Sequence, residues 1–179
     1  MTWTSFHRRG DVLRDVIAAA DQRRDGTLPR DVDGVSATFT DDLDLLGALQ
    51  LKWHTRLAGR IEREQMHQPM DLPAAVVRAW QQTAQDLPGI RAVIDEHRAH
   101  PTDEATDQIM RKSAAKEHVL LAVMAGQASA HDALAASVGA RIEERARMTT
   151  LPDDERGRLG AHAAERPTLL GRLKAALAA

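Results

Sequence analysis

The sequence contains no cysteine and no tyrosine, and aromatic residues make up only 3% of its 179 residues. Without cysteine the chain can form no disulfide, no thiolate nucleophile and no cysteine-bound metal site. Proteins that bind single-stranded nucleic acid usually stack the bases on aromatic side chains, and this chain has too few of them. We therefore expect a cytoplasmic protein with no nucleic-acid partner, because a cysteine-free chain suits a reducing compartment.

The chain also lacks a charge excess and a long apolar run. It has 24 basic and 26 acidic residues and a formal net charge of −2. This balance creates no overall field that would favour nucleic acid or an anionic membrane. No stretch approaches the ~20 apolar residues of a membrane span. The first residues, MTWTSFHRRGDVLRD, have no apolar run typical of a signal peptide, so we expect no membrane association.

What the chain does contain is a helical pattern. Hydrophobic residues make up 43% of it and recur mostly at three- and four-residue spacing, whereas no alternating β-branched run predicts a strand. We predict an all-α bundle, with the second, fifth and sixth helices at its centre. Glycine, proline and capping residues, among them Asp33 and Thr102, divide the pattern into six main helices. The predicted ranges are 4–23, 34–67, 72–85, 87–99, 102–126 and 130–148.

Residues 1–150 are predicted to form this single bundle domain, and residues 151–179 a short helical appendage packed on it or on a partner. The appendage is richer in glycine, proline and charge, with one helix from about 153 and another from about 168. Leu169, Leu173 and Leu177 share one face of the last helix. The stretch LGRLK (170–174) is similar to the short peptides that load cargo into encapsulin shells, but an ordinary docking helix is the favoured interpretation.

Six polar residues fall on or beside the apolar faces of the three central helices, and they form our candidate site. They are Gln50, His54, Glu117, His118, Arg141 and Arg145. A buried charge must be paired and hydrogen-bonded. We expect these residues to meet, with Glu117 paired to an arginine of the helix at 130–148. A network that only fixes helix register is the favoured interpretation, and a ligand pocket is the alternative.

No motif predicts catalysis, and no catalytic residue, metal ligand or cofactor is expected. One Glu-x-x-His string, Glu64 to His67, lies at a helix end without the second copy that a di-metal bundle needs. Glu143 and Glu144 are adjacent, so they point in different directions and form no acid–base pair.

Four stretches carry a resemblance to a known family: TWTSFHRRG, LLGALQLKWHTRLAGRIERE, DLPGIRAVID and KEHVLLAVMAGQASAHD. Over nearly its full length the chain resembles an uncharacterised family of small all-helical actinobacterial proteins. The resemblance implies a helical fold and brings no activity with it. A non-enzymatic protein that acts through protein–protein contacts or self-association is the favoured function. The alternative is a bundle that binds a small ligand or metal at the polar cluster, by fold-level analogy with ferritin-like and DinB-type proteins.

Overall fold

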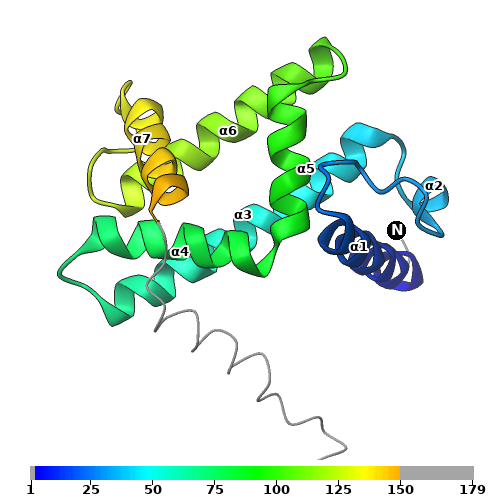
Figure 1. Ribbon diagram of the computed structural model, residues 1–179, viewed down its shortest axis with the longest axis horizontal. Coiled ribbons are helices and arrows are strands. Elements are labelled where there is room, and N and C mark those ends of the chain that lie inside the picture. The colour runs from blue at the N-terminus through cyan, green and yellow to red at the C-terminus, as the bar shows by residue number, and fades with distance from the viewer. Residues whose placement is uncertain (1–2, 150–179) are drawn as a thin grey trace, which may run out of the picture. The chain divides into compact units, whose positions relative to one another are not determined.

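The computed structural model describes residues 3–149, and every regular element in that range is an α-helix. Residues 3–148 belong to one compact unit. In chain order the helices are α1 (Trp3–Arg23), α2 (Val35–Thr38), α3 (Asp42–His67), α4 (Leu72–Asp86), α5 (Pro88–Ala99), α6 (Glu104–Met124) and α7 (Ala135–Met148) (Figure 1). The predicted all-α bundle is confirmed. The appendage at 151–179 lies outside the described residues, so the division of the chain near residue 150 stays a prediction.

The predicted helix at 34–67 is interrupted, and aspartates start the helices that follow. Phe39 is extended and ends α2, and the Asp41 side chain then accepts a hydrogen bond from the Asp44 amide at 2.8 Å to start α3. A short side-chain acceptor satisfies an amide that has no partner inside the first turn. The Asp103 side chain caps the start of α6 in the same way, with a hydrogen bond of 2.7 Å. The predicted cap at Thr102 was therefore one residue too early. The predicted cap at Asp33 is wrong, because Gly34 precedes α2 without a side-chain hydrogen bond.

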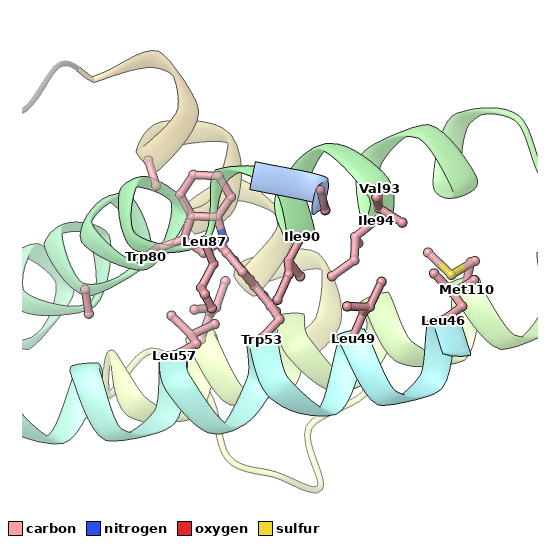
Figure 2. Close-up of a cluster of buried hydrophobic side chains, with 14 of the residues drawn as sticks. Leu46, Leu49, Trp53, Leu57, Trp80, Leu87, Ile90, Val93, Ile94 and Met110 are labelled. Carbon is pink, nitrogen blue, oxygen red and sulfur yellow. The ribbon is translucent and has the colours of Figure 1, made fainter. Parts of the chain in front are cut away.

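The core lies between α3 and the two helices that follow it. Leu49, Trp53 and Leu57 recur every four residues on α3 and are fully buried. Figure 2 shows them pointing from α3 toward Trp80 of α4 and Ile90 of α5. The two indole rings meet edge to face, with centroids 5.9 Å apart, which is a favoured aromatic geometry. The helical spacing of apolar residues therefore identified the buried face of α3 correctly.

Helix α7 packs at the edge of the bundle. Its backbone lies beside α4 and α6, and it reaches α5 through side chains, whereas the backbone of α5 lies beside α1, α3, α4 and α6. Figure 1 shows α5 crossing α3, with α4 on one side and α1 on the other. The prediction that the sixth helix packs at the centre was wrong. The sequence pattern shows which face of a helix is apolar but not which neighbour covers it.

Two glycines bring helix backbones together. A β-carbon at Gly139 would lie 1.8 Å from the carbonyl oxygen of His118, and one at Gly89 would lie 2.1 Å from the carbonyl carbon of Ala20. Only hydrogen in place of a side chain permits contacts this close. At Gly47 of α3, by contrast, the structure leaves open space.

Candidate functional site

The predicted polar cluster is centred on Glu117, whose side chain is completely buried. Its carboxylate is 2.7 Å from Arg98 Nη2 and 3.5 Å from Arg91 Nη1, and both arginines belong to α5. The indole N–H of Trp80 donates to Oε1 at 3.3 Å. His54 Nε2 lies 3.4 Å from Oε2, an electrostatic contact without hydrogen-bond geometry. Three helices, α3, α4 and α5, thus place polar groups against one buried carboxylate on α6.

A second carboxylate, Glu143 of α7, extends the cluster. It is 2.7 Å from His118 Nε2 of α6 and 2.7 Å from Arg147 Nη2 one turn along α7. Arg98 joins the two halves, because its other nitrogen lies 3.4 Å from Glu143. Asp95 of α5 closes the network by accepting from Arg91 at 2.6 Å and from Arg147 at 2.7 Å.

The charges of this network balance, and aromatic rings cover its cations. The network pairs three guanidiniums with three carboxylates, so its net charge is zero when both histidines are neutral. The guanidiniums belong to Arg91, Arg98 and Arg147, and the carboxylates to Asp95, Glu117 and Glu143. The Arg91 guanidinium lies 4.7 Å from the ring centroid of Trp53, and that of Arg147 lies 4.9 Å from Trp80. Planar guanidinium groups suit such sites because they stack on rings while their edges bind carboxylates.

The surrounding cations keep both buried carboxylates ionised. Burial alone would raise the pKa of Glu117, but the contacts with His54, Arg91 and Arg98 outweigh it and lower the pKa well below its ordinary value. Burial opposes ionisation of Glu143 as well, yet His118 and Arg147 lower its pKa to about 2. Opposite charges within a few ångströms favour the ionised form of a carboxyl group. Both groups are therefore anions at neutral pH and are poorly suited to act as general bases there.

The structure brings together only part of the predicted candidate site. Glu117, His54 and His118 lie in the network as described. Gln50 is buried outside it and donates to the sulfur of Met110 at 2.7 Å. Arg141 and Arg145 are exposed, so the expected pair between Glu117 and an arginine of that helix is wrong.

The reason is the rotation of α7. The apolar spacing of Leu134, Val138 and Ile142 predicts one face, and Ile142 is buried, but Leu134 lies before the helix and is exposed. The buried face consists of Ala135, Gly139, Ile142, Glu143 and Ala146. Because α7 packs backbone to backbone against α6 at Gly139, its small residues face inward and the two predicted arginines face solvent.

The sequence interpretation missed the cations that actually reach Glu117. Arg91, Asp95 and Arg98 follow one another at four- and three-residue spacing on α5, which places them on one helix face. That spacing was the available signal. It carries no information on burial, because a mixed-charge stripe is usually solvated.

A different feature marks the surface: a groove of about 590 Å³ between α1 and α3. We call it the α1/α3 groove. Its apolar lining consists of Leu13 from α1 and Leu43, Gly47, Ala48 and Leu51 from α3. Leu51 is 68% exposed, and no atom lies within 4 Å of where a β-carbon at Gly47 would stand. An exposed leucine beside an open apolar hollow is the kind of surface that marks binding sites.

Polar side chains close the two ends of the groove. At one end Arg9 and Asp44 form a 2.6 Å ion pair, and the Arg9 guanidinium lies 4.3 Å from the ring centroid of Phe39. At the other end Lys52 and Thr55 lead into a smaller hollow of about 240 Å³, which Arg56, Gly59 and Arg63 also line. We call this second feature the basic hollow.

Comparison with known proteins assigns neither feature. No family model, no curated protein and no solved structure matches the chain. Within residues 3–149, no group of three or more histidine, aspartate and glutamate side chains is placed to hold a metal ion. No helix among these residues is long and apolar enough to cross a membrane.

Proposed function

We propose that this chain is a non-enzymatic, cytoplasmic helical protein that acts through protein–protein contact, with the α1/α3 groove as its contact surface. The observation that carries the proposal is the 68% exposure of Leu51 at the edge of an apolar groove. A leucine left in water beside further apolar side chains gains free energy when a partner covers it.

The polar network around Glu117 also supports the proposal, because its groups are poorly placed to bind a substrate. Its carboxylates are engaged by arginine, histidine and tryptophan donors of the same molecule. Groups that already satisfy one another are poorly placed to hold a substrate. In this proposal the network fixes the register of five helices, α3 to α7, and the groove makes the contact.

The test compares two exposed leucines. Leu51→Asp places a charge in the groove, whereas Leu134→Asp changes a leucine of similar exposure, 65%, that does not line it. Native mass spectrometry of each full-length protein, purified from its own source, reports self-association and identified partners. We expect Leu51→Asp to lose the association of the wild-type chain and Leu134→Asp to keep it. A wild-type chain that is monomeric and without partners would refute the proposal.

A second candidate function, a small-ligand site at the polar cluster, rests on one specific observation. The indole N–H of Trp53 and the Nε–H groups of Arg91 and Arg98 are buried and have no hydrogen-bond partner within the described residues. Buried donors of this kind favour a small acceptor such as an anion. Addition of phosphate or acetate at constant ionic strength would then raise the melting temperature of the wild-type protein but not that of Arg98→Lys.

A further inference from the structure

We propose that the α1/α3 groove and the basic hollow together bind one acidic amphipathic helix of a partner protein. This inference rests on the proposed function, because it names the occupant of the same surface. The two features share Lys52 and Thr55, so they form one continuous track along α3. The track runs from Leu43 to Arg63, which is about 30 Å at the rise of an α-helix.

The apolar part of the track fits the side chains of a helix. Leu13 and Leu43 lie on its walls, and the missing side chains of Gly10 and Gly47 leave room between them. Helices that bind in grooves place apolar residues at positions i, i+3 or i+4, and i+7. Leucine or isoleucine side chains with this spacing on a partner would fill the hollow and cover Leu51.

The basic part selects the charge of that helix. Within the described residues, neither Lys52 nor Arg63 forms an ion pair, and both line the hollow. Arg56 shares its partner, Asp86, with Arg60, so two guanidiniums meet one carboxylate. The exposed Glu62 offsets part of this charge, but it does not line the hollow. Carboxylates on the flank of a bound helix would pair with these cations.

The same charges argue against a second copy of this chain as the occupant. A symmetric dimer through this surface would place the same patch of each subunit against the other. A two-fold axis near the basic hollow would then bring Lys52 and Arg63 of one copy close to the equivalent cations of its partner. Like charges brought together at an interface cost free energy, whereas an acidic helix gains it.

The experiment uses two synthetic helical peptides and the full-length protein. Both peptides carry leucines at i, i+3, i+4 and i+7, and they differ only in having glutamate or lysine on the flank. Fluorescence anisotropy measures their binding. We expect the acidic peptide to bind at least about tenfold more tightly than the basic one at low salt, because its glutamates attract Lys52 and Arg63 whereas the lysines of the basic peptide are repelled by them. High salt should reduce this difference.

Charge reversal in the hollow sharpens the test. The double variant Lys52→Glu/Arg63→Glu should prefer the basic peptide, and Leu51→Asp should lose binding of both. Lys112→Glu, an exposed charge reversal on α6, serves as the matched control and should behave like the wild type.

Two results would overturn the inference: no binding of the acidic peptide, or equal binding of both peptides with no effect of charge reversal. If neither peptide binds but Leu51→Asp still disrupts an association of the wild-type chain, the groove is a contact surface with a different occupant. In that case the proposed function holds and this inference fails. If Leu51→Asp changes neither association nor peptide binding, both fail.

Discussion

The charged network around Glu117 and the α1/α3 groove reverse the usual arrangement, in which apolar groups lie inside a protein and polar groups outside. The interior of the molecule holds the charged side chains of Arg91, Glu117 and Glu143, while an apolar groove with a 68% exposed leucine lies at the surface. The charges inside have their partners within the chain. On the outside, by contrast, Leu51 remains largely exposed to solvent. This difference separates a part of the molecule that maintains the fold from a part that is available to another molecule.

The largest expected effect comes from removing the carboxylate at the centre of the network. Glu117→Ala should lower the free energy of unfolding by about 3–5 kcal/mol, because it leaves buried cations without their partner. Urea denaturation measures the change. Glu144→Ala, an exposed glutamate of α7, is the control and should change stability by less than ~0.5 kcal/mol. If Glu117→Ala lost as little stability as the control, Arg91 and Arg98 would not need the Glu117 carboxylate as their partner.

The next effect concerns the backbone contact that sets the rotation of α7. Gly139→Ala should destabilise by about 1–3 kcal/mol, because its β-carbon has no space against the backbone of His118. Gly47→Ala fills open space on α3 and should stabilise by about 0.5–1 kcal/mol, since alanine favours a helix over glycine. In thermal unfolding, a lower melting temperature for Gly139→Ala and a higher one for Gly47→Ala would confirm that α6 and α7 touch while the groove is open.

Acid should weaken the charged network in the interior. The pKa of Glu143 falls from 4.5 in the unfolded chain to about 2 in the folded protein. A lowered folded-state pKa stabilises the protein above the unfolded value, and this stabilisation is lost as the pH falls from about 4.5 toward 2. One such group gives a slope of up to ~1.4 kcal/mol per pH unit. Glu143→Gln should be less stable at pH 7, with a flatter dependence below pH 4.5.

The smallest effect on stability is expected in the groove. Leu51→Asp should change the free energy of unfolding by less than ~0.5 kcal/mol, as exposed substitutions usually do. Its effect should appear in association instead, as proposed above. A loss of several kcal/mol in chemical denaturation would mean that Leu51 packs inside the chain, and the contrast between the two regions would disappear.

The sequence by itself determined the helices and much of the core. The spacing of Leu49, Trp53 and Leu57 identified the buried face of α3, because apolar residues that recur with the helical period share one side. It also indicated that Glu117 and His54 lie toward the interior. These are properties of single helices, so they can be read from local periodicity.

Only the tertiary structure decided which helices meet, and therefore which charges pair. Gly139 allows α7 to touch the backbone of α6, and the resulting rotation turns Arg141 and Arg145 to solvent and Glu143 inward. Arg91 and Arg98 reach Glu117 because α5 packs against both α3 and α6. The groove likewise exists only between α1 and α3. Distances between helices depend on packing contacts far apart in the sequence, and no local pattern encodes them.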